Sequence, residues 1–190
     1  MSVLIFLDHY DGHIKKASFE ALSYGAAVAK QLGIAAEALL LGTVNDDLAT
    51  LGKYGISKIY QVNNESLNNV DTQVYAQAVK DAVTATAATI VIFSHNQTGK
   101  AVAPRVAAGL KAGLVAGAIS LPDTASWLVF KKTVFSGKAY ANVNISSAVK
   151  IISRNPNSYK IVTGEGVATL SQLSIALAAP SIKITGVNKV

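Results

Sequence analysis

Histidine and carboxylate side chains follow two apolar segments of this sequence. His9 and His13 alternate with Asp8 and Asp11 after the first segment, and His95 follows a later one. Imidazole and carboxylate groups are common ligands of transition metals, so a metal site is one hypothesis. These histidines fall in segments that read as loops, not one turn apart on a helix, and loops are often polar because they are exposed. We therefore predict no metal-ligating residue in this chain.

The turn Thr98-Gly99-Lys100 lies where the amino terminus of a helix could receive an anion. A phosphate loop requires a glycine, four further residues and then Gly-Lys-Ser/Thr. Here the earlier glycine is missing and Ala101 follows Lys100, so the signature of a nucleoside triphosphatase fails. A tight turn with a helix cap is the simpler interpretation. The alternative function left open is a nucleotide-binding or hydrolase-type enzyme that uses the loops 9–15 and 94–100.

Arg105 follows Pro104, and a proline is typical of the first turn of a helix. A cation is mildly unfavourable near the amino terminus of a helix because of the helix dipole. This placement predicts a specific partner for Arg105, either a carboxylate across an interface or a phosphate. A solvent-exposed arginine is the equally weighted alternative.

No other set of residues indicates catalysis. The sequence has no cysteine, no Gly-x-Ser-x-Gly elbow and no Gly-x-Gly-x-x-Gly stretch. Only 11 acidic residues are present, and most of them read as helix caps or helix surface. We therefore predict a chain without catalytic or cofactor-binding residues, which is not an enzyme.

The elements that would position these residues alternate as strands and helices up to residue 121. Gly113 is expected to close the last of the helices. Such alternation predicts an α/β fold of three layers, like the adenine nucleotide alpha hydrolases, with a parallel sheet of order 3-2-1-4-5. The loops 9–15 and 94–100 would meet at its switch point, between the first and fourth strands. The predicted strands are 3–8, 34–41, 58–62, 89–93 and 114–121, and the predicted helices are 17–32, 48–53, 71–87 and 104–112.

The pattern changes after Pro122. Segments 127–135, 137–145 and 148–154 read as three strands with short turns, and without a helix between them they should be antiparallel neighbours at a sheet edge. Segment 164–180 reads as loop with weak helical character, and 181–187 as a last strand. We expect one domain over residues 1–190.

Composition narrows the class of protein. Of the 190 residues, 51% are hydrophobic and 15% charged, which favours a compact core. No apolar run reaches about 18 residues, so we expect no membrane insertion, and a cytoplasmic protein is the simplest interpretation. The net charge is +6, yet basic residues are dispersed and not interleaved with aromatic ones, so we expect no nucleic-acid binding. A solvated surface or a basic face that docks an acidic protein partner both remain open.

Several motifs together resemble the amino-terminal domain of the electron transfer flavoprotein alpha subunit. Two positions depart from the family pattern: Asp8 stands where glutamate is usual and Lys138 where asparagine is frequent. Neither departure should disturb the fold. The motifs, in family order, are residues 3–9 with Asp11-Gly12, 16–23, 31–33, 98–100, 104–108 with Leu110, the tyrosine-like Phe135 with 136–139, and 146–150.

This resemblance implies a heterodimer of alpha and beta subunits that carries electrons from acyl-CoA and other dehydrogenases, through a membrane quinone oxidoreductase, to the respiratory chain. In the family, FAD binds chiefly in a carboxy-terminal alpha domain, which carries Gly-Arg-Gly and Gly-Gln-Thr-Gly-Lys stretches that this sequence lacks. The resemblance therefore implies a scaffold and subunit-interface domain for fatty acid oxidation. FAD would belong to the full-length subunit and not to this chain alone, and the linker would begin near residue 188. The family's AMP lies in the beta subunit, so no nucleotide-binding residue is assigned here.

Overall fold

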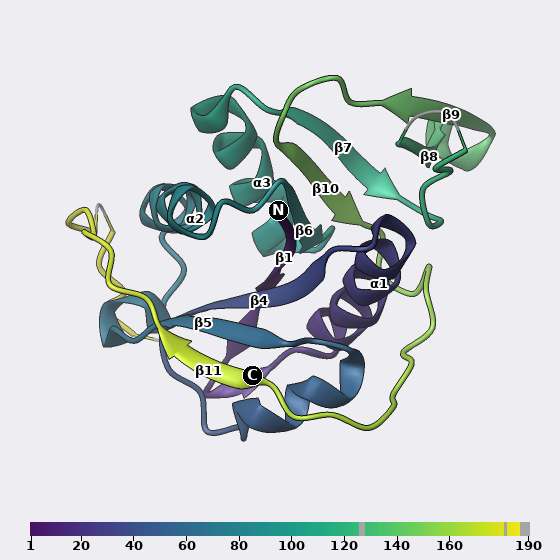
Figure 1. Cartoon of the computed structure of the whole chain (residues 1–190). Helices are drawn as coiled ribbons and strands as arrows, with labels where there is room; N and C mark the ends of the chain where they lie inside the picture. Colours follow the sequence, from purple (N-terminus) through teal and green to yellow (C-terminus); the bar gives the residue numbers. More distant parts are fainter. Residues whose placement is uncertain (126–127, 181, 187–190) are drawn as a thin grey trace.

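A computed structural model of the chain describes residues 1–125, 128–180 and 182–186. Its helices and strands alternate, and one mostly parallel sheet crosses the molecule (Figure 1). The predicted α/β class is therefore confirmed. The helices are α1 (Lys16–Leu32), α2 (Thr72–Thr86) and α3 (Gln97–Leu110), with the 3-10 turns η1 (Leu48–Tyr54), η2 (Glu65–Asn68) and η3 (Phe135–Gly137).

The sheet among the described residues has nine strands in the order β11-β5-β4-β1-β6-β10-β7-β8-β9. All neighbours from β11 to β7 pair in parallel, and β8 and β9 are antiparallel. A separate small hairpin joins β2 (His9–Tyr10) to β3 (His13–Ile14). The sheet strands are β1 (Ser2–Leu7), β4 (Ala35–Leu41), β5 (Lys58–Val62), β6 (Ile90–Ser94), β7 (Gly113–Ala118), β8 (Val129–Val134), β9 (Ala139–Asn144), β10 (Lys150–Arg154) and β11 (Thr169–Gln172).

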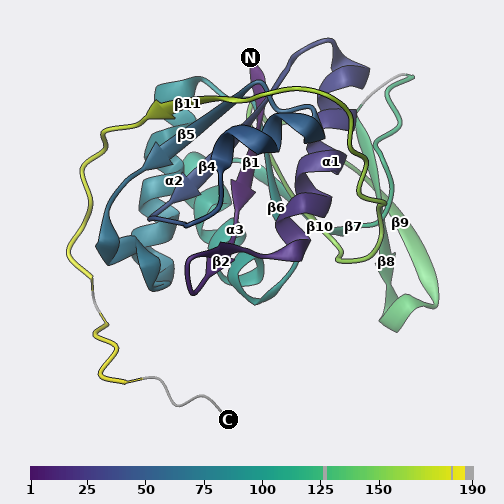
Figure 2. The same ribbon diagram turned by 90° about the horizontal axis from the view of Figure 1, so that it is seen from below.

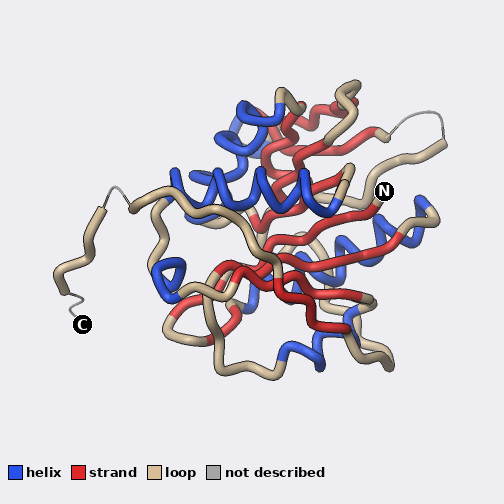
Figure 3. Tube along the Cα trace, turned by 60° about the vertical axis from the view of Figure 1, so that its left-hand side comes forward, coloured by secondary structure: helices blue, strands red, loops and turns tan. Residues whose placement is uncertain are grey.

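Helices cover both faces of the sheet, which gives the three layers (Figure 3). Every residue of β1 is buried, as expected of a central parallel strand covered on both sides. Its side chains alternate, so Val3 and Ile5 pack with α1 on one face while Leu4 and Phe6 pack with α2 and α3 on the other. The apolar face predicted for the helix over 71–87 is buried, as the α2 residues Tyr75, Ala78, Val79, Ala82 and Val83 show.

The predicted strand order is right as far as 3-2-1-4 and wrong at its end. β1 lies next to β6, so the switch point falls where it was expected. β7 does not pair with β6, because β10 lies between them and pairs in parallel with both. The expectation that 148–154 is an antiparallel edge strand is therefore wrong. Ile151 and Ile152 are fully buried on opposite faces, as in other central strands.

A hairpin takes the place of a crossover helix here. Parallel neighbours normally need a crossover connection, usually a helix, between them. Between β7 and β10 the chain instead forms the β8–β9 hairpin and then returns to the amino end of the sheet, where Gly113 N donates to Ser147 Oγ at 2.8 Å. The antiparallel pairing of β8 with β9 is confirmed. Trp127, at the predicted start of the first edge strand, lies outside the described residues.

Helix α3 begins seven residues earlier than predicted. Its cap is Asn96, and Pro104 lies inside the helix, not in its first turn. Gly113 does not close it, because Lys111 takes the left-handed conformation at the carboxyl end. The dipole argument for a partner of Arg105 therefore does not hold.

The carboxy-terminal expectations are only partly right. Segment 164–180 contains β11, which extends the sheet beyond β5, and no helix. Residues 182–186 form no strand, which corrects the strand predicted over 181–187. Ser181, Val187 and the predicted linker near residue 188 lie outside the described residues.

Candidate functional site

Asp8 is the centre of the polar groups at the carboxyl edge of the sheet. Its side chain is only 3% exposed, and Oδ2 accepts hydrogen bonds from Lys15 Nζ at 2.9 Å and Asn96 Nδ2 at 2.7 Å. Its backbone N–H donates to Ser18 Oγ at 2.9 Å. The two loops predicted to meet at the switch point therefore do meet. The carboxylate joins them, so it is already occupied by internal partners.

The three histidines at this edge bond to different parts of the chain. His9 Nε2 lies 2.7 Å from the Leu41 carbonyl, His13 Nδ1 lies 3.3 Å from Asp46 Oδ1, and His95 Nδ1 lies 2.8 Å from Ser153 Oγ. No group of three His, Cys, Asp or Glu side chains that could hold a metal ion occurs among the described residues. The hypothesis of a metal site at these loops is not supported.

His95 lies close to two ammonium groups, those of Lys100 and Lys132. Burial lowers the pKa of His95, and the nearby ammonium groups of Lys100 and Lys132 lower it further. The neutral imidazole is therefore the favoured form, and it is held between Ser153 and solvent. The hydroxyl that His95 faces, Ser153 Oγ, is only 1% exposed and also accepts from Gly117 N at 3.4 Å, so this Ser–His contact is buried away from any substrate. No carboxylate bonds to the ring among the described residues to complete a catalytic set.

Gly99 serves packing and does not form a phosphate cradle. A Cβ at this position would lie 1.9 Å from the carbonyl oxygen of Ser94, so only glycine allows the helix to start this close to β6. The cap Asn96 accepts a hydrogen bond from Gly99 N at 2.9 Å through Oδ1. One of the amide groups that an anion would use is thus satisfied within the chain. This supports the interpretation as a capped turn.

A buried ion pair connects α1 to the end of β10. Arg154 is 0% exposed and donates to Glu20 Oε2, which also accepts from Asn157 N at 2.8 Å. Burial lowers the pKa of Arg154, and the Glu20 carboxylate opposes that change. This pair fixes the start of the segment 155–168 that connects β10 to β11. The sequence offered no signal for it, because 134 residues separate its members.

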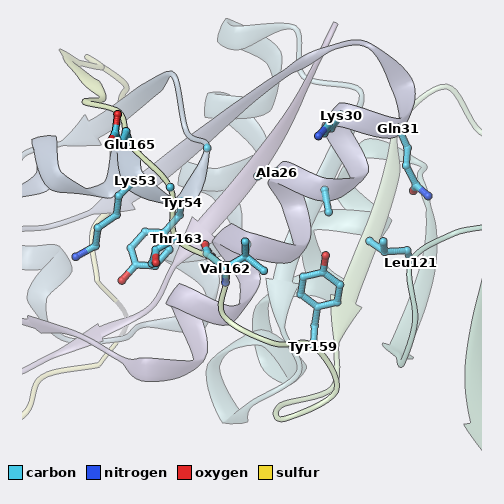
Figure 4. Close-up of a pocket in the computed structure, with 14 residues that line it drawn as sticks. Ala26, Lys30, Gln31, Lys53, Tyr54, Leu121, Tyr159, Val162, Thr163 and Glu165 are labelled. Atoms are coloured by element: carbon cyan, nitrogen blue, oxygen red, sulfur yellow. Dashed lines mark hydrogen bonds between the residues drawn. The ribbon is translucent and has the colours of Figure 1, made fainter.

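An open groove of about 800 Å³, here called the α1 groove, lies between α1, η1 and the connecting segment. Ala26 and Ala27 contribute from α1, and Figure 4 shows the rings of Tyr54 and Tyr159 on opposite sides of Val162. Lys30 and Lys53 also line it. Glu165 adds a carboxylate to the lining. Apolar walls with charged groups at the margin can bind an amphipathic group, and no hydrogen bond joins Glu165 to either lysine among the described residues. Sequence reasoning missed the groove because no local pattern shows that the connecting segment passes alongside α1 and η1.

Arg105 lies apart from both regions. It is exposed on α3 and lines a shallow depression with Gln73, Gln77 and Lys80 of α2. The two cations and two amides that line this depression include no nucleophile and no acid–base pair, so they do not form a catalytic site. The structure therefore brings Asp8 and the start of α3 together, but not the histidines or Arg105.

The fold is a three-layer α/β domain. Asp8 and Asn96, polar groups at the carboxyl edge of its sheet, bond to other groups of the same chain. The chain matches the family "Electron transfer flavoprotein domain" over residues 3–178, and it belongs to that family. It is 28% identical over 179 residues to the electron transfer flavoprotein subunit alpha of Syntrophomonas wolfei, covering 94% of this chain and 55% of that protein.

Further relatives agree with this assignment. Identity is 26% over 156 residues to the electron transfer flavoprotein subunit alpha of Bacillus subtilis, covering 82% of this chain and 48% of that protein. The chain is also 28% identical over 115 residues to the lactate dehydrogenase (NAD(+),ferredoxin) subunit LctC of Acetobacterium woodii, and this match covers 60% of this chain and 28% of that protein. The chain thus spans about half the length of the first two relatives. Among the described residues, no helix is both long and apolar enough to cross a membrane.

Proposed function

We propose that this chain is the amino-terminal scaffold domain of an electron transfer flavoprotein alpha subunit. It supports a flavin domain and contacts a beta subunit, in a carrier that takes electrons from acyl-CoA and other dehydrogenases and passes them towards the respiratory chain. The family match supports the electron-transfer role. The scaffold role rests on one observation: the polar side chains at the carboxyl edge, led by Asp8, bond to each other and to the backbone.

FAD and the reaction partners belong to the whole carrier in this proposal. The chain covers only about half of its first relatives, so the flavin-holding part would lie in a further domain. The domain itself is not an enzyme and holds no catalytic, cofactor-binding or metal-ligating residue. The donors would be dehydrogenases and the acceptor a membrane quinone oxidoreductase. The name of the LctC relative supports dehydrogenases beyond those of fatty acid oxidation as donors.

Mixing the 190-residue protein with an electron transfer flavoprotein beta subunit and with FAD tests this proposal. We expect association with the beta subunit in size-exclusion chromatography and no flavin retained by the chain alone. If the chain alone holds flavin with micromolar affinity, the placement of the cofactor is wrong. If it never associates with a beta subunit, the scaffold role is wrong.

Calorimetry with AMP and ATP addresses the alternative of a nucleotide-binding enzyme. We expect no binding below millimolar concentration, because Asn96 caps α3 and Gly99 N is already bonded. Submillimolar binding that is lost in Lys100→Ala would favour the alternative instead.

A further inference from the structure

The excess positive charge of the chain is confined to one stretch. The sequence has 17 basic and 11 acidic residues, and between positions 124 and 164 it has six basic residues and no acidic one. The rest of the chain therefore carries eleven of each and is formally neutral. Arg154 is buried against Glu20, so the charge that solvent meets comes from five lysines. Three of them, Lys131, Lys132 and Lys138, belong to the β8–β9 hairpin and its tip.

This hairpin reaches away from the body of the domain (Figure 2). Among the described residues, Ala118 and Lys132 are the one residue pair that joins the hairpin to β7, and backbone bonds from Ile119 to Lys131 and between Asp123 and Val129 hold the start of β8. One face packs inward, where Phe130 is fully buried and Val143 contacts the core. The other face carries Lys131 and Tyr140, with the ammonium group 4.1 Å from the ring centroid.

Large aromatic side chains on this hairpin are exposed. Phe135 is 79% exposed at the tip, and Tyr140 is 62% exposed on β9. Phe135 has φ 51° and Ser136 has φ 52°, which is a left-handed backbone conformation that residues other than glycine rarely adopt. The backbone of the tip is thus strained while it presents an aromatic ring to solvent. Strain and exposed aromatic surface together are typical of a binding element.

The free edge of β9 indicates what kind of partner fits. β9 is the last strand of the sheet, and its sequence, Ala-Tyr-Ala-Asn-Val-Asn, contains no charge and no proline to block further pairing. Where β9 pairs with no further strand among the described residues, its outward N–H and C=O groups can be satisfied by a protein backbone but not by lipid tails. The three lysines of the hairpin, Lys131, Lys132 and Lys138, call for carboxylates on that partner.

We propose that the β8–β9 hairpin is the element that docks the companion subunit, through an acidic surface of that subunit with an apolar pocket for Phe135. This inference rests on the proposed function, since it names the contact surface of the scaffold role. It also gives the basic face a role as a docking surface. Composition alone does not decide between that role and a solvated surface. The edge of β9 and the Phe135 ring would make the core of the contact, and the lysines its rim.

Binding of the 190-residue protein to an electron transfer flavoprotein beta subunit, measured by isothermal titration calorimetry at low and moderate salt, tests the inference. We expect Phe135→Ser to weaken binding at least tenfold, because a central aromatic anchor is lost. The double variant Lys131→Glu/Lys138→Glu should weaken it too, and more strongly at low salt.

Matched controls separate the site from general effects. Tyr10→Ser removes another exposed aromatic residue from a hairpin, since Tyr10 is 57% exposed on β2. Lys16→Glu/Lys111→Glu makes the same charge change away from the β8–β9 hairpin, at exposed positions. We expect both controls to bind within twofold of the unsubstituted protein.

The possible failures are distinguishable. If the unsubstituted protein binds and the hairpin variants bind equally well, the docking inference is wrong and the proposed function stands. If the unsubstituted protein does not bind the beta subunit, both are wrong. Sedimentation with vesicles of phosphatidylcholine and phosphatidylglycerol tests whether the hairpin binds lipid instead. If the protein binds the vesicles and Phe135→Ser abolishes this binding, the hairpin contacts lipid and the proposal is wrong.

Discussion

His95 at the end of β6 is a titratable residue whose charge the fold opposes. Burial first, and then Lys100 and Lys132, lower its pKa. The unfolded chain takes up this proton near pH 6.5, whereas the folded chain takes it up only at lower pH. The contribution to stability is therefore complete above about pH 6.5 and is lost as the pH falls below it.

We predict that Lys100→Gln raises the pKa of His95, because it removes one of the charges that oppose protonation. An NMR titration of the imidazole signals measures this directly, and unfolding in urea between pH 7 and pH 5 should show a smaller loss of stability. Lys111→Gln is the control, since it removes a charge at the opposite end of α3. Equal His95 pKa values in both variants would mean that Lys100 does not act on this histidine.

Single residues also show what a sequence can and cannot predict about the carboxyl edge of the sheet, where Asp8 lies. The placement of Asp8 and of the loop 94–100 at the switch point was correct, because the carboxyl ends of adjacent parallel strands meet at one edge. The Asp8–Asn96 bond joins residues 88 positions apart, so no local pattern announces it. The same limit applies to the pair of Glu20 and Arg154, and to the role of Gly99, which depends on one carbonyl of the neighbouring strand.

At the level of elements, α1 and α2 end in the same geometry with different residues. Gly33 closes α1 at φ 64°, and its N–H donates to the carbonyls of Ala29 and Lys30. Ala87 closes α2 at φ 52° with equivalent bonds, although a Cβ is unfavourable in this conformation. We predict that Ala87→Gly raises the free energy of unfolding by about 1 kcal/mol and that Gly33→Ala lowers it by about the same amount.

Urea unfolding monitored by circular dichroism checks both changes. Ala87 is exposed and no atom lies within 4 Å of a Cβ built on Gly33, so neither substitution alters packing. The pair thus serves as its own control. A loss of stability in Ala87→Gly would show that the entropy of the unfolded chain outweighs the strain at this helix end.

Elements defined by strong local patterns were predictable, and elements defined by their neighbours were not. β1 and α2 have apolar residues at strand and helix spacing, so their identity needed no tertiary information. α3 was misplaced because Pro104 is usual in a first turn, yet this helix tolerates it in its interior. β10 was misplaced because short connections without a helix indicate antiparallel neighbours, whereas here the β8–β9 hairpin itself spans the parallel crossover.

Across the whole molecule, the connecting segment 155–168 borders the α1 groove and leads into β11, which extends the sheet beyond β5. It carries no regular structure of its own and is fixed by a small number of contacts. Val162 N donates to Ser23 Oγ at 3.0 Å, and Gly164 N donates to the Lys53 carbonyl at 2.7 Å. A Cβ on Gly52 would lie 2.4 Å from the backbone of Val167, so this residue lets the segment lie close to η1. Such a segment can open while the sheet stays folded.

We predict that Ser23→Ala makes the segment open more often without weakening the sheet. The substitution removes the bonds of the Ser23 hydroxyl to both the N–H and the C=O of Val162. A loss of about 1 kcal/mol or more should speed amide exchange at Val162 and Gly164 at least about fivefold, while the amides of β1 and β6 keep their rates. Hydrogen exchange followed by NMR resolves these positions separately. Thr84→Ala is the matched control, because its hydroxyl bonds to the Lys80 carbonyl on the exposed surface of α2. If the β1 amides accelerate by the same factor as Val162, the segment opens only when the whole domain unfolds, and the α1 groove is then as stable as the core.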